Sequence, residues 1–349
     1  MDPILPSEAA AAAPNWGRQH LRLHRQLLRH PQLLPRGAPL LLAVSGGQDS
    51  MALTGLLLDL QRLHGWSLQL WHGDHRWRAE AAAQAAELAA WAGGRGLNLH
   101  HDRAPARHSS EAEARTWRYG CLERLARQLG CGHVVCGHTA SDRAETLLLH
   151  LARGSHRRGL ASLRAQRPLA PSLTLVRPLL IFSRSETAQI CSSLGLPVWP
   201  DASNDDRRYS RNRLRAEVLP VLEALHPGAS RRLSGVAERL AAADDASREL
   251  IDLALAGLAL PEPQPPCGPF GLLRRPLGQL EAANQQQLLH RWLERHSGLS
   301  LAARQLETLV QRLHPSQGPG SLDLSRPWRL HWTRFELLLT RDPEPTTDA

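Results

Sequence analysis

The sequence predicts an α/β fold in which a doubly wound parallel sheet is followed by a helical connector and a small second α/β domain. Two observations lead to this prediction. Short apolar runs, the first of them Leu40–Val44, alternate with stretches in which leucine or alanine recurs at helical spacing. A proline-rich segment, PEPQPPCGP at 261–269, then separates this region from a shorter one that again contains helix-like and strand-like stretches.

The expected elements follow one another in a regular order. Strands are expected at Leu40–Val44, Trp66–His72, Leu97–His101, His133–Cys136 and Thr174–Leu180. Helices are expected at Met51–Leu63, Ala79–Trp91, Ser110–Leu129, Ser141–Leu151, from Ser183 onward, and at Arg213–Leu225, Ser230–Leu260, Asn284–Arg295 and Ala302–Leu313, with a strand pair at Trp328–Leu339. Glu113 and Glu186 stand three residues after Ser110 and Ser183, which predicts a capping box at each helix start, and Ser141 is expected to cap its own helix.

The stretch between the first strand and helix, SGGQDS from Ser45 to Ser50, is suited to holding phosphate groups. The pair Gly46 and Gly47 lets successive backbone N–H groups point at one spot, and the N-terminus of the following helix adds partial positive charge there. The two serine hydroxyls can donate further hydrogen bonds. Two glycines alone would favour an ordinary tight turn. The full SGGxDS string after a buried strand is more specific.

This string resembles the pyrophosphate loop (PP-loop) of the N-type ATP pyrophosphatases, whose fold is similar to that of the adenine nucleotide alpha hydrolases. It is not the GxxxxGK[ST] loop of other nucleotide hydrolases, since the chain contains no lysine. The resemblance implies that Ser45, Gly46, Gly47, Gln48, Asp49 and Ser50 bind ATP. Asp49 is also the candidate ligand for Mg²⁺, which proteins bind through few carboxylates together with phosphate oxygens.

Composition favours a polyanionic partner. The formal net charge is +9, and all 42 basic residues are arginine, whose planar fork matches phosphates and stacks on bases. A solvated basic surface without a partner is the alternative. The five cysteines form no CxxC pair, which disfavours a disulfide scaffold and a zinc ribbon. No apolar run reaches membrane-spanning length and no basic signal-peptide region is present, so we expect a cytoplasmic protein without a membrane partner.

Chemically active side chains follow the second and fourth expected strands. His72, Asp74, His75 and Arg78 come after the second strand, and His138, Asp142 and Glu145 after the fourth. Ligands of doubly wound sheets bind at the carboxyl ends of the strands, so the tips after Val44, Trp71 and Cys136 should converge on one crevice. Asp142 and Glu145 share a helix face, although first-turn acids also favour the helix dipole without any further function.

Four segments in consistent order resemble the tRNA(Ile)-lysidine synthetases. The tip GHTASDRAETLLLHLARGSHRRGL is similar to their GHHxxDxxET…RGSG..GL region, and the tip after the second strand to their H-x-[ND]-H-x-x-R pattern. EARTWRY, ending at Tyr119, resembles their ARxxRY helix, and DASNDDRRYSRNRLR, from Asp201, their D-x-SN…Y-x-RN-x-[IL]-R segment. The similarity runs from Leu40 to Pro227. Thr139 stands where the family has a histidine, Ser141 replaces an aspartate, and Arg76-Trp77 replaces Gly-Leu.

The resemblance implies a ligase that joins lysine to C2 of the wobble cytidine 34 in the isoleucine tRNA with a CAU anticodon. ATP first adenylates the C2 oxygen, and lysine then displaces AMP to give lysidine, which changes the codon specificity from methionine to isoleucine. The implied partners are this tRNA, L-lysine, ATP and Mg²⁺, and a homodimer is among the assemblies considered.

The implied residue roles fall into three groups. The catalytic residues are Asp49, His138, Asp142, Arg115 and Arg211. The lysine ammonium group is expected to pair with Asp142 and Glu145, and His138 or a carboxylate to accept its proton. Contacts to tRNA or substrate are expected at His75, Arg78, Arg118, Arg208, Arg211 and Arg215, where arginines lie beside Tyr209 in a polar strip; a solvated loop is the alternative there.

The expected domain organisation follows from these segments. It consists of a basic N-terminal extension (1–36), a PP-loop catalytic domain (37–227), a helical connector (228–260), the proline-rich linker (261–269), a tRNA substrate-specificity domain (270–340) and a disordered tail (341–349). Two rival functions are considered. A tRNA thiolase would need clustered cysteines, and amide-forming relatives lack the SRNRLR-type segment. A purely RNA-binding protein would not need the intact SGGQDS loop.

Overall fold

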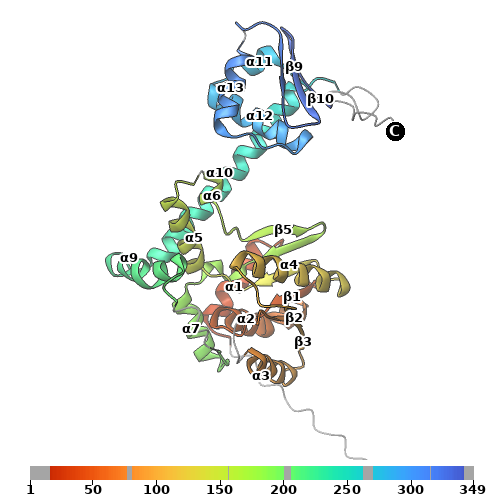
Figure 1. The fold of residues 1–349 in the computed structure, drawn as a ribbon. Helices are drawn as coiled ribbons and strands as arrows, with labels where there is room; N and C mark the ends of the chain where they lie inside the picture. The colour runs from red at the N-terminus through yellow and green to blue at the C-terminus, as the bar shows by residue number, and fades with distance from the viewer. Residues whose placement is uncertain are drawn as a thin grey trace, which may run out of the picture. The chain divides into compact units, whose positions relative to one another are not determined.

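The computed structural model describes residues 16–76, 81–155, 157–199, 206–261, 270–314 and 316–341 (Figure 1). Contacts divide the chain into two compact units, Met1–Ala241 and Ala242–Ala349. Several predicted features lie outside the described residues, namely the start of the N-terminal extension, Arg78, Asp201 to Asp205, most of the proline-rich linker with Cys267, and the tail after Arg341. Within the described ranges, no helix has the length and apolar character that crossing a membrane requires.

The first unit is built on a six-stranded sheet in the order β3-β2-β1-β4-β6-β5. The strands are β1 (Pro39–Ala43), β2 (Ser67–Asp74), β3 (Asn98–Arg103), β4 (His133–Cys136), β5 (Gln166–Ala170) and β6 (Leu173–Val176). All neighbours run parallel except the edge pair β5 and β6. Leu42 pairs with Leu70 on one side and Val135 on the other, so β1 lies inside the sheet, as its continuous apolar run predicts.

Helices cover both faces of this sheet, which confirms the doubly wound prediction (Figure 1). The helices of the first unit are α1 (Arg18–Arg29), α2 (Gln48–His64), α3 (Ala81–Gly93), α4 (Glu111–Gln128), α5 (Ala140–Ala152), α6 (Arg157–Leu160), α7 (Arg184–Ser193), α8 (Ser210–Arg213) and α9 (Leu219–Leu225). Leu40 and Leu42 pack with α1, α2, α3 and α7 in one core, whereas Leu41 between them packs with α4 in another. Side chains alternate across a strand, so one apolar run supplies both cores.

Three predictions of local structure were wrong. Ser141 does not cap α5. Thr139 does, because its backbone is extended and its hydroxyl accepts from the Asp142 N–H. Glu113 accepts from the N–H of Ser109 rather than that of Ser110, although Ser110 caps α4 as expected. The fifth strand ends at Val176, because Pro178 opens a 3₁₀ helix, Pro178–Ile181.

The helix expected from Arg213 to Leu225 is interrupted. A π-helical turn, Leu214–Val218, joins α8 to α9, whose second residue is Pro220. A proline has no N–H to continue the ladder and its ring displaces the preceding carbonyl, so the α-helical pattern cannot pass through this point unbroken. This irregular turn carries Arg215, and π-turns inside helices often re-aim a functional side chain.

Helix α10 (Ala229–Leu258) begins in the first unit and ends in the second. The second unit contains a four-stranded sheet in the order β7-β10-β9-β8, with β7 (Phe270–Leu273), β8 (Gly320–Asp323), β9 (Trp328–Trp332) and β10 (Glu336–Arg341). Helices α11 (Arg274–Gly278), α12 (Ala282–Ser297) and α13 (Ala303–Leu313) accompany it. The predicted strand pair is confirmed as the antiparallel pair β9 and β10. Trp292 and Trp332 are buried in its core.

Candidate active site

The loop between β1 and α2 is held in shape by its own serine side chains. Ser50 Oγ donates to the Gly47 carbonyl over 2.8 Å and accepts from the Ser45 N–H over 3.2 Å. The two serine hydroxyls lie 3.1 Å apart. Gly46 adopts φ +81°, a left-handed conformation that favours glycine. The loop therefore has a fixed backbone at the start of α2, where partial positive charge accumulates.

The tip of β4 contacts this loop so closely that only glycine fits there. A Cβ atom on Gly137 would lie 2.8 Å from the Asp49 carbonyl oxygen and 2.9 Å from the Ser50 nitrogen. Both neighbours are backbone atoms, which cannot move aside as a flexible side chain could. Gly137 thus sets the distance between the β1–α2 loop and His138, the next residue in the chain.

The strand tips converge on one crevice of about 370 Å³, as the doubly wound topology predicts. The lining includes Val44, which follows β1, Trp71 to Asp74 in the second half of β2, and Cys136 at the end of β4. Predicted site residues in the lining are Ser45, Gly47, Gln48, Asp49, Ser50, His75, Arg118, His138, Asp142 and Arg215. The sequence segments singled out for chemistry are therefore brought together in space.

Asp49 is anchored by two residues of α7. Arg184 Nη1 lies 3.0 Å from one carboxylate oxygen, and Thr187 Oγ1 donates to the other over 2.5 Å. Burial, followed by the negative charge of Asp142, raises the pKa of Asp49 above its ordinary value. Two carboxylates that repel one another across a crevice create a place where a cation would be favourable.

The charges of His138 and Asp142 act on one another beside Asp49. Burial lowers the pKa of His138 to about 4, and the opposing charge of Asp142 only partly offsets this effect. Its Nδ1 is buried and has no hydrogen-bond partner within the described part of the chain. The Asp142 carboxylate accepts from the Thr139 N–H over 2.8 Å and from its hydroxyl over 2.9 Å. Although burial alone would raise it, His138, Thr139 and Arg215 together lower the pKa of Asp142.

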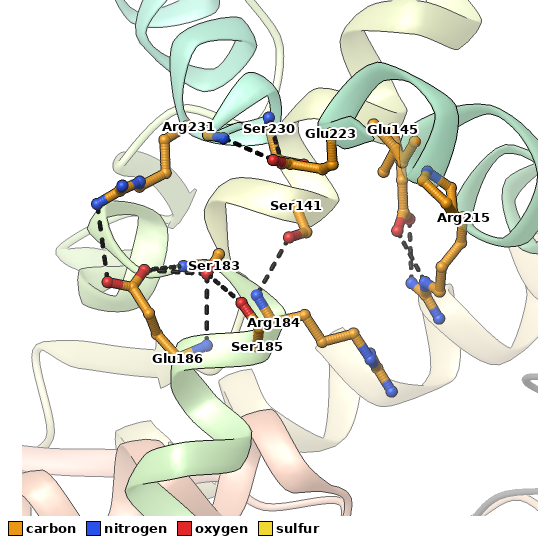
Figure 2. A pocket seen from close by; sticks show the side chains of 13 residues that line it. Ser141, Glu145, Ser183, Arg184, Ser185, Glu186, Arg215, Glu223, Ser230 and Arg231 are labelled. Atoms are coloured by element: carbon orange, nitrogen blue, oxygen red, sulfur yellow. Dashed lines mark hydrogen bonds and ion pairs between the residues drawn. The ribbon is translucent and has the colours of Figure 1, made fainter. Parts of the chain in front are cut away.

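Glu145 is fully buried and held by Arg215 in a two-pronged ion pair (Figure 2). Arg215 Nε lies 2.7 Å from one carboxylate oxygen and Nη2 lies 3.0 Å from the other. The same Nη2 is 3.4 Å from Asp142. Arg211 approaches Glu145 at 3.6 Å and donates to the Thr146 hydroxyl. Arg215 therefore links Asp142, which lines the crevice, with Glu145 behind it. Burial raises the pKa of Glu145 although Arg215 is its partner.

A second cavity of about 520 Å³ shares Arg184 and Arg215 with the crevice (Figure 2). Its other charged lining residues are Glu145, Glu186, Glu223 and Arg231. Figure 2 shows Arg215 turned toward Glu145, and Glu186 between Ser183 and Arg231. Both signs of charge thus surround this cavity, as recognition of an amino acid with an ammonium and a carboxylate group would require.

Some predicted residues lie away from the crevice lining. Arg208 is mostly exposed and pairs with Asp206 at 2.7 Å. The guanidinium of Arg115 lies over the Tyr119 ring, and Gly46 faces Trp199. Arg211 stands behind the crevice with Glu145.

Sequence reasoning missed three residues that shape the site, namely Arg184, Thr187 and Trp199. The backbone N–H of Trp199 donates to the Gly46 carbonyl over 3.0 Å, and its ring is 3.1 Å from where a Gly46 Cβ would be. The capping box at Ser183 predicted the start of α7, and hence that Arg184 and Thr187 occupy its first turn. No pattern indicated that this turn would face Asp49.

The donor set around the crevice fits a magnesium ion held mainly by phosphate oxygens. Within the described ranges, no group of three or more histidine, cysteine or acidic residues could hold a metal by itself. Asp49 and Asp142 supply hard oxygen atoms, and Mg²⁺ typically uses only one or two carboxylates when it accompanies nucleotide phosphates.

Comparison with known proteins agrees with this geometry. Residues 20–222 match the family model described as a PP-loop domain, which implies ATP binding. The tRNA(Ile)-lysidine synthase of Parasynechococcus marenigrum (strain WH8102) is 51% identical over 329 residues, which cover 93% of this chain and 95% of that relative. The chain belongs to the tRNA(Ile)-lysidine synthase family. A lysidine synthase of Prochlorococcus marinus is 42% identical over 93% of this chain and 96% of its own.

A solved structure supports the fold. The U34-tRNA thiolase from Methanococcus maripaludis, with its iron–sulfur cluster, is similar with a TM-score of 0.54 over 63% of this chain and 78% of that one. Its sequence identity of 15% means that this likeness concerns the fold alone. Membership of the lysidine synthase family confirms the resemblance, the α/β PP-loop fold and the enzyme class predicted from the motifs.

Proposed function

We propose that this protein ligates L-lysine to C2 of cytidine 34 in the isoleucine tRNA with a CAU anticodon, using ATP and forming lysidine. The observation that carries the proposal is the single crevice in which the PP-loop, His138 and Asp142 meet. The protein that contains this crevice belongs to the tRNA(Ile)-lysidine synthase family. The cytoplasmic location and a homodimer remain predictions.

The first step is adenylation of the cytidine. The C2 oxygen attacks the α-phosphate of ATP, the bond to pyrophosphate breaks, and the β1–α2 loop offers preorganised N–H groups to the leaving pyrophosphate. Asp49 would hold Mg²⁺, which would supply positive charge beside the phosphate oxygens. Arg184 keeps the Asp49 carboxylate in a fixed position.

The second step transfers lysine. Its ε-amine attacks C2, the C2–O bond breaks and AMP leaves with the oxygen. The amine must lose a proton first, and we assign its acceptance to His138 or a neighbouring carboxylate: the His138 imidazole is unprotonated at pH 7, and the negative charge of Asp142 favours its protonated form. Asp142 lies beside His138 and can hold the ammonium group, and Glu145 borders the second cavity, where Arg184 and Arg231 can bind the lysine carboxylate.

The proposal is tested by incubating the purified protein with ATP, labelled lysine and the CAU isoleucine tRNA. The tRNA is then digested and its nucleosides are separated. Label in lysidine is the expected result. ATP-independent tRNA binding without any labelled nucleoside would instead support the rival function, an RNA-binding protein.

The residue roles are tested by separating the two steps. Asp49→Ala should reduce ATP–pyrophosphate exchange in the presence of tRNA by more than about 100-fold, because it removes a transition-state contact. Asp142→Ala should leave residual exchange but abolish lysine transfer, and Glu145→Ala should raise the KM for lysine. Wild-type rates in all three variants would remove these assignments.

A further inference from the structure

Four arginines gather around Tyr119 and Cys136 beside the crevice, and they are called here the Tyr119 arginine cluster: Arg115, Arg118, Arg167 and Arg177. The guanidinium carbon of Arg115 on α4 lies 5.2 Å from the centroid of the Tyr119 ring. That of Arg167, on the edge strand β5, lies 4.9 Å from the same centroid. Two segments far apart in sequence thus place their positive charges on one aromatic ring.

The charges of this cluster are not balanced by ion pairs among the residues that the structure describes. None of its arginines forms an ion pair with a carboxylate in the described part of the chain, whereas Arg184, Arg208, Arg213 and Arg215 in the same unit all do. Arg177 is buried, and its Nε has no hydrogen-bond partner there, although Nη1 donates to the Arg164 carbonyl over 2.8 Å. Burial, together with the like charges of Arg167 and Arg115, lowers the pKa of Arg177.

Gathering like charges without compensation costs free energy in the unbound protein. An anion that enters the cluster would recover this cost, and a chain of phosphates could meet several of its guanidinium groups at once. Arginine also stacks on nucleobases, as does tyrosine, so an RNA strand uses both kinds of group present.

The position of the cluster favours RNA over the triphosphate of ATP as its ligand. Arg118 and Tyr119 line the crevice, but Arg115 and Arg167 are not part of its lining. The triphosphate is expected at the β1–α2 loop, so arginines beyond the rim are better placed for a strand that continues out of the crevice. We propose that the Tyr119 arginine cluster binds the sugar–phosphate backbone of the RNA substrate next to the nucleotide that enters the crevice. The identity of that RNA rests on the proposed function.

The cluster is tested on the full-length protein with Arg167→Ala. Binding of fluorescently labelled CAU isoleucine tRNA is measured by anisotropy, without ATP, over a series of KCl concentrations. Arg127→Ala is the matched control, since Arg127 lies on α4 like Arg115, is exposed, and has its own partner Glu123 at 2.7 Å. We expect Arg167→Ala to weaken binding about tenfold and to reduce the slope of log K against log salt by about 1. Arg127→Ala should change neither.

A second variant and a second readout keep the outcome clear. Arg115→Ala, at an exposed position, should weaken binding similarly and serves if Arg167→Ala does not fold. Equal tRNA affinity in Arg167→Ala, Arg115→Ala and Arg127→Ala would overturn the inference, as would a raised KM for ATP with unchanged tRNA binding. Weakened tRNA binding in a protein that forms no lysidine would contradict the proposed function and leave the inference standing.

Discussion

Two groups of arginines each contribute to the lining of the same crevice, one through Arg184 and Arg215 and the other through Arg118, and they differ in how their charge is balanced. Arg215 binds both oxygens of the buried Glu145 and reaches Asp142, and Arg184 binds Asp49. The Tyr119 arginine cluster has no such acids within the described residues. Among the described residues, the arginines on one side of the crevice are paired with acids of the protein, whereas we propose that those on the other side pair with a bound RNA.

The two arrangements serve different purposes. Paired charges fix side chains before substrate arrives, so the acids of the crevice need no rearrangement during the reaction. Arginines that are not paired with acids can attract an anionic ligand, and this attraction makes the binding of the ligand depend on salt concentration. Replacing an arginine should therefore cost folding stability on the first side and RNA affinity on the second.

The largest expected effect is that of Arg215→Ala. It leaves the Glu145 carboxylate buried without its two-pronged partner, which should destabilise the protein by about 3 kcal/mol and reduce lysidine formation more than 100-fold, as order-of-magnitude values. Thermal unfolding and the labelled-lysine assay measure the two quantities.

A double variant and an exposed control sharpen this test. Adding Glu145→Gln to Arg215→Ala removes the buried charge, so stability should return in part while activity does not. Arg208→Ala breaks only an exposed pair with Asp206 and should change stability by less than about 1 kcal/mol. Equal losses in Arg215→Ala and Arg208→Ala would contradict the distinction between the two sides.

The next largest effect is expected from backbone packing, rather than charge, on the side of the crevice where the arginines are paired. Gly137→Ala would force a Cβ into backbone atoms of Asp49 and Ser50, which should cost about 1–3 kcal/mol and raise the KM for ATP. Gly120→Ala is the matched control, because no atom lies within 4 Å of its added Cβ and it sits inside α4. The control should be neutral or slightly stabilising. Normal ATP kinetics in Gly137→Ala would show that the loop tolerates displacement.

A smaller effect of opposite sign is expected at the Tyr119 arginine cluster. Arg167→Glu places a carboxylate among the remaining arginines, so it should stabilise the unbound protein by about 0.5 kcal/mol while weakening tRNA binding. Comparison of melting temperatures and tRNA affinities for this variant and the wild type measures both changes. A lower melting temperature together with an unchanged tRNA affinity in Arg167→Glu would contradict the view that the charges of the cluster are unbalanced.

The smallest expected effect concerns pH. Burial, followed by the charges of Arg118 and His108, lowers the pKa of His75 to about 4. Between about pH 6.5 and 4 the unfolded chain binds a proton at this histidine and the folded protein does not. The free energy of unfolding therefore decreases as the pH falls through that window. His75→Gln should therefore reduce the drop in melting temperature between pH 7 and pH 5. An unchanged drop would argue against this shift.

Local patterns were sufficient for several parts of the site. The apolar run at Leu40–Val44 and the glycines after it predicted a buried strand and a shaped loop, because backbone preference and hydrogen bonding act over a few residues. The rule for strand ends then placed His138 and Asp142 beside that loop. Membership of the lysidine synthase family followed from the order of the motifs.

The tertiary structure alone decided how these groups are paired. Asp49 meets Arg184 and Thr187 across more than a hundred residues of sequence, and the edge strand β5, which no pattern predicted, brings Arg167 to Tyr119. Ion pairs and ring contacts between distant segments depend on how helices and strands pack, and packing is not contained in any local window. The sequence by itself thus determined the family, the parallel part of the sheet and the nucleotide loop, whereas folding determined which of the described charges are paired with one another.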